Sequence, residues 1–569
     1  MKGNAKVAVI GSAACILIIA VVLISILIQS LIPSKEKMKL TDYYKVKDKE
    51  VLVILQDKIY EKKGLLIDGR VYIDYETIAE KFNKRFYWDY NENVLTYTTP
   101  TEILRAEADK DEYTVTKSTI GTKNDYAYPI VKVFADKVYI SLDFVKEYSD
   151  LSYKYYDNPN RVIINYIWGK YMYSDVKKST QLRYEPSIKS PILLELSADT
   201  SLMYVDTEEA PKHGFVKVMT SDGVKGYVKK KSLKKADYKE LSSSYKAPEY
   251  TSQKRSGKIN MVFHQMTNID ASYNLENLIN KTKNVNVVSP TWFSIKDESG
   301  KINSLATTSY VEKAGRIGLE VWALVSDLNN VVDEKELFSR TSSRDTLSNA
   351  LIEAALQYKL NGINIDFEKI PSNTGKDYIQ FIRELSVKCR NSGIVLSVDN
   401  YVPAEYNKYY DKEEQGKIVD YVIVMAYDEH YAGSDAGPVS SIGYVKDAVK
   451  NILTMVPKEK TIIAIPFYTR LWKETKDGKV DSQPLSMTPA KQWIKGNNID
   501  AKWDDSLGCY YAEMKKKDIT YRLWQEESKS IEEKMKVIYD ADVAGCAAWK
   551  LGLEEESIWD VIIKYLNKQ

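Results

Sequence analysis

The sequence predicts a multidomain protein with an N-terminal transmembrane helix, an α+β repeat module, a small β-barrel module and a C-terminal (β/α)8 TIM barrel. Three observations lead to this fold class. Residues 7–32 carry no charge, residues 69–165 contain an internal repeat, and apolar strands alternate with helical segments from residue 258 onward. A chain of 569 residues is also too long for a single hydrophobic core, so several separately packed domains are expected.

The composition excludes some classes of protein. The 81 Lys and Arg residues nearly balance the 79 Asp and Glu residues, and no basic block is present, so no nucleic-acid partner is expected. The 4 cysteines form no close-spaced pair, which argues against a disulfide framework. The 43 tyrosines suit a sugar-binding surface, but tyrosine also favours β-strands, so composition alone leaves both readings open.

Residues 1–34 are expected to form a short tip and a membrane anchor. The uncharged run at 7–32 is 26 residues long, whereas a helix needs about 20 apolar residues to span a bilayer. A cleaved signal peptide has a shorter apolar run that ends in a small-x-small site, and Leu31-Ile32-Pro33 provides no such site. Lysines flank the run on both sides, so charge leaves the orientation open.

Residues 40–166 contain the repeat. The segment 69–73 recurs 67 residues later at 136–140, and the segment 87–91 is echoed at 155–158. Each copy is predicted to form a strand, a helix and a hairpin. The unit resembles the stalk modules related to the N-terminal domain of copper amine oxidases. The region contains no histidine or cysteine that could bind copper, so a spacer or wall-binding module is expected.

Residues 167–235 are expected to form a small β-barrel, because short strands and glycine turns follow each other closely. The motif at 182–187 and the motif at 226–228 resemble motifs of the bacterial Src-homology-type barrels of wall hydrolases. The Ser- and Lys-rich residues 236–257 are expected to be a linker.

Residues 258–569 show the strand and helix alternation of a parallel α/β fold. Eight strands fit a (β/α)8 barrel, whose chemistry is located at the C-terminal ends of the strands. The strands are expected to start near Ile259, Val285, Leu319, Gly362, Ile394, Tyr421, Thr461 and Gly545.

The fourth strand carries the residues of chemical interest. Its period-two alternation places Asn364, Asp366 and Glu368 on one side of the strand and apolar residues on the other. Two carboxylates are costly to bury without a purpose. The Cα atoms of Asp366 and Glu368 are expected to lie roughly 7 Å apart. At that separation the charge of one carboxylate can raise the pKa of the other, which then keeps a proton for an acid step. The alternative explanation of the spacing is a strand end that runs into solvent, where the carboxylates are simply hydrated.

The segment from Asn361 to Glu368 closely resembles the Asp-Gly-x-Asp-x-Asp-x-Glu signature of glycoside hydrolase family 18. Three further motifs follow in the family's order: residues 425–428 end strand six, residues 465–468 end strand seven, and Trp549 ends strand eight. Residues 289–293, after strand two, are similar to the bacterial wall and spore-cortex branch of that family.

The resemblance implies hydrolysis of β-1,4 bonds in N-acetylglucosamine-containing polysaccharide, above all peptidoglycan, by substrate-assisted retaining catalysis. It implies that Glu368 protonates the glycosidic oxygen, that Asp366 holds the substrate acetamide N–H and that Tyr427 donates to the acetamide carbonyl. Asn361 and Asn364 stand where the family has aspartates, and Asn364 has no proton to share with Asp366. The candidate substrate-binding residues are Asn364, Met425, Asp428, Tyr468, Trp549 and Trp292. Trp292 and Trp322 lie at strand ends and could extend the sugar platform, but packing in the core would explain either residue equally well.

Two other functions are alternatives to a glycosidase. A non-catalytic lectin on the same barrel is one alternative, but such relatives typically lack the acid that Glu368 supplies. A metal hydrolase is the second, because His264 and His430 fall near strand ends. These histidines lack paired motif spacing, so no metal or other cofactor is expected.

A polysaccharide substrate implies a single-pass protein of the cell membrane with its catalytic domain outside the cytoplasm and its small β modules on the cell wall.

Overall fold

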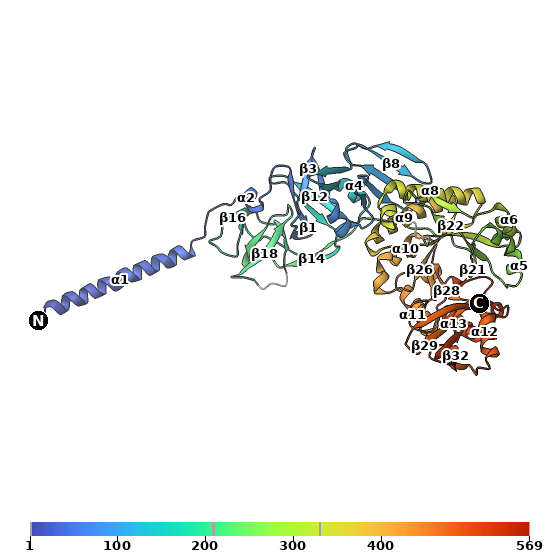
Figure 1. Ribbon diagram of the computed structural model, residues 1–569. Coiled ribbons are helices and arrows are strands. Elements are labelled where there is room, and N and C mark those ends of the chain that lie inside the picture. Colours follow the sequence, from blue (N-terminus) through green and yellow to red (C-terminus); the bar gives the residue numbers. More distant parts are fainter. Residues whose placement is uncertain (1–2, 207–210, 329–331, 568–569) are drawn as a thin grey trace. The chain divides into compact units, whose positions relative to one another are not determined.

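The computed structural model describes residues 3–206, 211–328 and 332–567. The chain divides into two compact units. The first contains residues 1–86 and 128–247, and the second contains residues 87–127 and 248–569 (Figure 1). The expected fold class is confirmed: an N-terminal apolar helix and additional β domains precede a closed eight-stranded parallel barrel.

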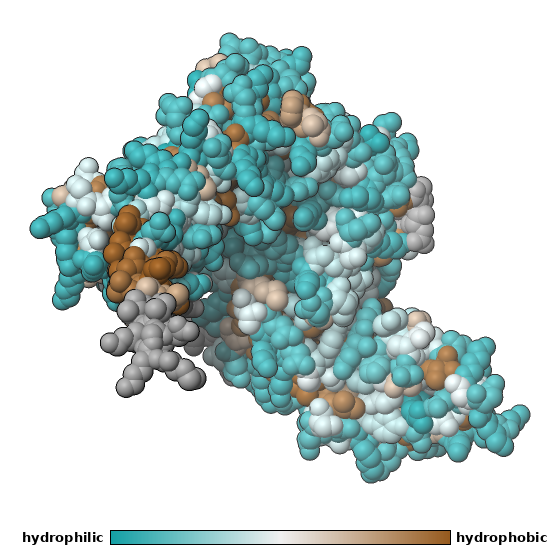
Figure 2. Space-filling view, turned by 90° about the vertical axis from the view of Figure 1, so that its left-hand side faces the viewer, coloured by the Kyte–Doolittle hydropathy of each residue, from teal (hydrophilic) through white to brown (hydrophobic). Residues whose placement is uncertain are grey.

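Helix α1 (Gly3–Leu31) has the length and composition of a membrane span or a signal sequence. Its segment Ala13–Leu31 has a mean hydropathy of 2.9 and is 0% buried. At 1.5 Å per residue this helix exceeds the roughly 30 Å of a bilayer's hydrocarbon core. In Figure 2 helix α1 forms a brown, hydrophobic surface, whereas most of the remaining visible surface is teal.

The two copies of the repeat meet in one sheet of the first unit. Strands β4 and β11 pair in antiparallel fashion with Ile73 opposite Ile140, residues that occupy the same position in the two copies. The sheet order is β10-β11-β4-β3-β1-β13-β12, and β2 pairs with β1. The strands are β1 (Glu50–Leu55), β2 (Lys58–Ile59), β3 (Gly64–Ile67), β4 (Arg70–Asp74), β10 (Val131–Phe134), β11 (Lys137–Ser141), β12 (Ser152–Tyr156) and β13 (Arg161–Asn165).

The first unit also contains a seven-stranded sheet of order β16-β15-β19-β18-β17-β14-β20. It encloses a small core that includes Leu182, Leu202 and Val218. Its strands are β14 (Gly169–Asp175), β15 (Thr180–Arg183), β16 (Ile192–Leu196), β17 (Ser201–Tyr204), β18 (Phe215–Thr220), β19 (Lys225–Lys229) and β20 (Asp237–Leu241).

All eight predicted barrel strands are present and parallel. The order β21-β34-β28-β27-β26-β25-β24-β22 closes through the pairing of β21 with β22. One core lies inside the strands and a larger one lies between the strands and the surrounding helices (Figure 1). The strands are β21 (Ile259–His264), β22 (Val287–Ile295), β24 (Glu320–Ser326), β25 (Gly362–Asp366), β26 (Val395–Tyr401), β27 (Tyr421–Met425), β28 (Thr461–Pro466) and β34 (Gly545–Trp549).

A five-stranded antiparallel sheet, which the sequence reading did not anticipate, is inserted between β28 and helix α13 (Ser528–Asp540). Its order is β30-β29-β33-β32-β31. Its strands are β29 (Tyr468–Thr475), β30 (Val480–Ser486), β31 (Lys502–Asp504), β32 (Cys509–Lys516) and β33 (Ile519–Gln525).

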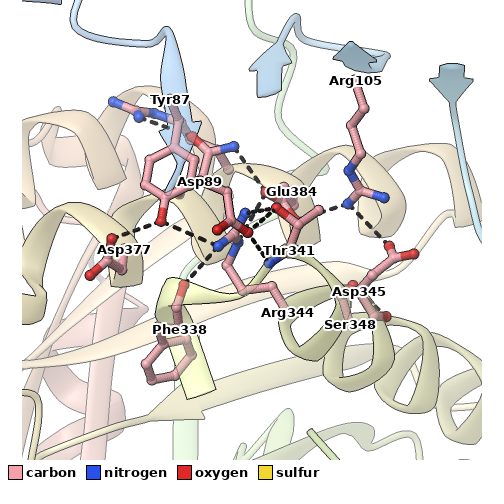
Figure 3. Close-up of polar contacts among 12 residues, drawn as sticks. Tyr87, Asp89, Arg105, Phe338, Thr341, Arg344, Asp345, Ser348, Asp377 and Glu384 are labelled. Carbon is pink, nitrogen blue, oxygen red and sulfur yellow. Dashed lines mark hydrogen bonds and ion pairs between the residues drawn. The ribbon is translucent and has the colours of Figure 1, made fainter. Parts of the chain in front are cut away.

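A second five-stranded sheet, β5 to β9, belongs to the barrel's unit although it lies within the repeat region in sequence. It caps helix α8 (Thr341–Tyr358), which has no side-chain cap of its own. Asp89 accepts hydrogen bonds from the N–H of Thr341 at 2.6 Å and from its hydroxyl at 2.7 Å (Figure 3). The strands are β5 (Tyr87–Asp89), β6 (Val94–Thr98), β7 (Ile103–Glu107), β8 (Glu112–Thr116) and β9 (Gly121–Asp125).

Charged side chains are buried where this sheet meets α8 and helix α9 (Gly375–Ser392). Glu384 on α9 is 0% exposed and accepts from Arg344 Nε at 3.2 Å and from Arg105 Nη2 at 3.1 Å (Figure 3). Arg105 comes from β7 and also pairs with Asp345 at 3.2 Å. Within the helices Glu384 already pairs with Arg344 and Asp345 with Lys388. Because breaking a buried ion pair leaves an uncompensated charge, it is Arg105 of the sheet that depends on the two helix carboxylates.

Candidate active site

The fourth barrel strand presents its polar residues to the barrel interior. Ile363, Ile365 and Phe367 pack in the core between strands and helices, as the alternation predicts. Asn364 and Asp366, on the opposite face of β25, are 0% and 6% exposed.

Glu368 lies immediately after β25, half-buried at the C-terminal end of the barrel. Its backbone N–H donates to Asp327 Oδ1 at 2.9 Å, which fixes the chain at this point. Its Oε2 accepts a hydrogen bond of 2.7 Å from the Tyr401 hydroxyl. Burial raises the pKa of Glu368, and the Tyr401 hydrogen bond partly opposes that rise. A carboxyl group with a raised pKa can remain protonated and act as an acid.

Asp366 is enclosed by other acids. Burial raises the pKa of Asp366 well above its usual range, and the charges of Asp399, Glu368 and Asp327 raise it further. Among the hydrogen bonds of the described residues, Asp366 Oδ1 has no partner. Asp399 on β26 accepts from Asn364 Nδ2 at 2.7 Å.

Strands six, seven and eight bring their expected residues to the same end of the barrel. Tyr427 and Trp549 pack against the core inside the barrel, and Trp549 lies 5.5 Å from the ring of Phe263. Met425 is 7% exposed at the end of β27. Asp428 lies exposed at the rim with a positive φ of 56°, and it accepts a hydrogen bond from the hydroxyl of Tyr468.

The two tryptophans considered for a sugar platform are core residues. Trp292 is 2% exposed and packs against Tyr310 between the strands and the helices, with ring centroids 4.9 Å apart. Trp322 is 0% exposed and stacks on Tyr421, at the opposite end of the barrel from Glu368. Neither side chain is available to a glycan in this structure.

The histidines form no metal centre among the described residues, where no group of three His, Cys, Asp or Glu side chains could hold an ion. His264 is buried and lies 2.8 Å from the Tyr310 hydroxyl. Burial, with a smaller effect of Lys550, lowers its pKa to about 4, so it is neutral near pH 7. His430 contacts the carbonyl of Asp435 at 3.0 Å.

Three residues of the site were missed by sequence reasoning: Asp327, Asp399 and Tyr401. For Asp399 a signal existed, because Ser397 and Asp399 alternate with the apolar Leu396 and Val398 as the fourth strand does. Tyr401 continues the same spacing, but the polar Asn400 interrupts the alternation before it. Asp327 follows β24 in a loop, where periodicity offers no guide.

Residues 330–554 match the family described as glycosyl hydrolases family 18, and residues 53–164 match the copper amine oxidase N-terminal domain. The uncharacterized glycosylase YvbX of Bacillus subtilis is 28% identical over 283 residues, which cover 47% of this chain and 81% of that protein. The cortical fragment-lytic enzyme of Bacillus anthracis is 24% identical over 306 residues, covering 51% and 71%. Among solved structures, a chitinase from Chromobacterium violaceum has a TM-score of 0.50 at 18% identity and covers 55% of this chain and 100% of that one; this likeness supports the fold alone.

Proposed function

This chain is a glycosidase with a glycosyl hydrolase family 18 domain, and we propose that it cleaves β-1,4 bonds of N-acetylglucosamine-containing polysaccharide, specifically peptidoglycan, by substrate-assisted retaining catalysis. The observation that carries the proposal is the position of Glu368. It lies at the barrel's C-terminal end, half-buried and with a raised pKa, beside a second buried carboxylate.

In this mechanism Glu368 protonates the glycosidic oxygen, and the acetamide carbonyl of the substrate attacks the anomeric carbon. A retaining enzyme with its own nucleophile needs a second carboxylate about 5–5.5 Å away across the sugar. Asp366 ends β25 and Glu368 follows it by two residues, so both carboxyl groups lie at the same strand end, which is unfavourable for attack from the opposite side of the sugar. The acetamide therefore supplies the nucleophile.

Asp366 and Tyr427 orient that acetamide. Asp366 accepts from the acetamide N–H and stabilises the positive charge of the oxazolinium intermediate, while Tyr427 donates to the acetamide oxygen. Asp366 lies at the carboxyl end of β25, and Tyr427 follows the end of β27, two strands away. Burial raises the pKa of Tyr427 well above its usual range, and the charges of Asp399 and Asp366 raise it further. Tyr427 therefore remains a protonated donor near neutral pH.

Residues at the rim of the barrel bind the hydroxyl groups and the ring face of the sugar. Asp428, fixed by Tyr468, accepts from sugar hydroxyls, and Trp549 stacks under the pyranose in the −1 position. Asn364 and Met425 shape the floor of the site beside them.

Peptidoglycan is the preferred polysaccharide because a relative that aligns over 306 residues of this chain is named a cortical fragment-lytic enzyme. Helix α1 would then hold the protein in the cell membrane as a single-pass anchor, with the catalytic unit outside the cytoplasm. The small β modules of the first unit would contact the cell wall.

The dependence on the substrate's acetamide tests the mechanism. Aryl β-glycosides of N-acetylglucosamine and of its short β-1,4 oligomers should be cleaved with retention at the anomeric carbon, as followed by proton NMR. A thiazoline mimic of the oxazolinium should inhibit, and the matching glucoside and de-N-acetylated sugar should not react. Comparable rates on the glucoside and the N-acetylglucosaminide would contradict the mechanism.

A further inference from the structure

Asp399 is a buried carboxyl group at a position that the mechanism above does not use. It is 3% exposed on β26, the strand next to β25. The register pairs Ile365 with Val398, so the next residue on each strand brings Asp366 beside Asp399. Neighbouring strands lie about 4.8 Å apart, and both side chains point into the barrel.

The two carboxyl oxygens of Asp399 differ in their hydrogen bonding. Asn364 Nδ2 donates to Asp399 Oδ2 at 2.7 Å. The amide of Asn364 is oriented by Ser397, whose hydroxyl donates to Asn364 Oδ1 at 2.6 Å. Oδ2 of Asp399 is therefore an acceptor, and Oδ1 remains for another interaction.

Each of the two carboxyl groups has one buried oxygen without a hydrogen-bond partner. Asp366 Oδ1 and Asp399 Oδ1 are both buried, and neither has a hydrogen-bond partner among the described residues. Two ionised carboxylates cannot donate a hydrogen bond to each other, and a buried acceptor without a donor is unfavourable. One proton between the two carboxyl groups would satisfy both oxygens and remove one buried charge.

We propose that Asp399 is a positioning residue that shares one proton with Asp366 across β25 and β26, with the proton on Asp399 when substrate is bound. The donated hydrogen bond then holds Asp366 as a carboxylate that faces the acetamide N–H. The inference rests on the proposed function, in which Asp366 performs that role. Asn364 completes the arrangement by fixing the acceptor oxygen of Asp399.

The other titratable groups around the pair are acids. Glu368 lies two residues after Asp366, beyond the end of β25, and Asp327 directly follows β24. The phenols come from three further elements: Tyr378 from α9, Tyr401 from β26 and Tyr427 from the end of β27. Each charge that acts on Asp366 disfavours its ionisation, so a single negative charge for the pair is the arrangement that costs least.

Infrared spectroscopy of protein labelled with 13C-carboxyl aspartate tests the shared proton without any substrate. At pH 7 the labelled wild-type chain should show a protonated carboxyl band, and Asp399→Asn should lose intensity from it. In that variant the amide donates to Asp366, which is then fully ionised. Asp518→Asn, at an exposed aspartate on the inserted sheet, serves as the matched control and should leave the band unchanged. A wild-type spectrum with no protonated aspartate, or an unchanged band in folded Asp399→Asn, would overturn the proposal.

Kinetics supply the second readout. Asp399→Ala removes the donor, so Asp366 should resist ionisation, the acidic limb of the kcat profile should move to higher pH, and kcat near neutral pH should fall roughly tenfold to hundredfold. Asp399→Asn should recover most of that loss because its amide can donate. An acidic limb unmoved in Asp399→Ala contradicts the proposal. If the proton is detected but no N-acetylglucosaminide is cleaved, the proposed function fails and the shared proton stands.

Discussion

At the scale of single residues, the acid strength of Glu368 depends on one hydrogen bond from a neighbouring strand. The Tyr401 hydroxyl donates to Glu368 Oε2 at 2.7 Å and thereby lowers the pKa of a carboxyl that burial raises. The proposed mechanism needs Glu368 protonated, so it predicts that the alkaline limb of the kcat profile reports the pKa of Glu368 in the substrate complex.

Tyr401→Phe should therefore extend activity to higher pH. Without the donated hydrogen bond the pKa of Glu368 rises, and the protonated acid persists further into the alkaline range. The expected displacement of the alkaline limb is about half to one pH unit, from the usual strength of such a bond. Tyr238→Phe, at an exposed tyrosine of the first unit, is the control for a lost phenol and should leave the profile in place. A limb that moved to lower pH would show that the bond acts in the opposite sense.

The fourth strand shows what could be predicted at this scale. Alternation identified the inward face that carries Asn364, Asp366 and Glu368. The same period applied from Val287, which faces inward, puts Trp292 on the helix side, where it is buried. The interaction of Asp327 with the Glu368 N–H could not be predicted, because it depends on how a loop after β24 approaches another strand.

At the scale of elements, the sheet β5–β9 completes the barrel's unit. Asp89 is 0% exposed and takes the N–H of Thr341 at the start of α8. Glu92 takes the next N–H, that of Ser342, at 2.9 Å. Two of the four N–H groups that every helix start leaves without an internal partner are thus satisfied by another part of the chain.

Asp89→Ala should destabilise the second unit. Loss of a helix cap typically costs about 1–2 kcal/mol, and the buried hydroxyl of Thr341 also loses its acceptor. Thermal unfolding followed by circular dichroism should show a lower Tm than wild type. Asp111→Ala, at an exposed aspartate in the turn before β8, should leave Tm unchanged. Equal Tm values for the two variants would mean that the hydrogen bonds of Asp89 do not stabilise α8.

The repeat illustrates the limit of prediction at this scale. Similar segments 67 residues apart indicated two copies of one unit, and their equivalent strands β4 and β11 do pair. The hairpin of the first copy instead extends into β5–β9 and packs on α8 and α9. Tertiary contacts decide this difference, since the local patterns of the two hairpins are alike.

At the scale of the whole molecule, the proposal that α1 is a membrane anchor predicts where the catalytic unit works. Removing residues 1–34 should give a soluble protein with unchanged kcat, because both units have their own cores. The intact chain should sediment with membranes and stay there through a high-salt wash. Fractionation by centrifugation, with activity assayed in both fractions, measures the difference. A truncated protein that still remained with membranes would remove the anchor role from α1.

The central claim is that Glu368 makes this chain a hydrolase of the glycan strands of peptidoglycan. Digestion of purified peptidoglycan, with the released fragments analysed by mass spectrometry, tests it most directly. The wild-type chain should release fragments whose new reducing ends are N-acetylglucosamine. Glu368→Gln should reduce their rate of release by roughly a hundredfold to ten-thousandfold, because the amide cannot act as an acid, while binding of the glycan persists. Wild-type protein that releases no such fragments, or a Glu368→Gln variant that matches it in rate, would contradict the account.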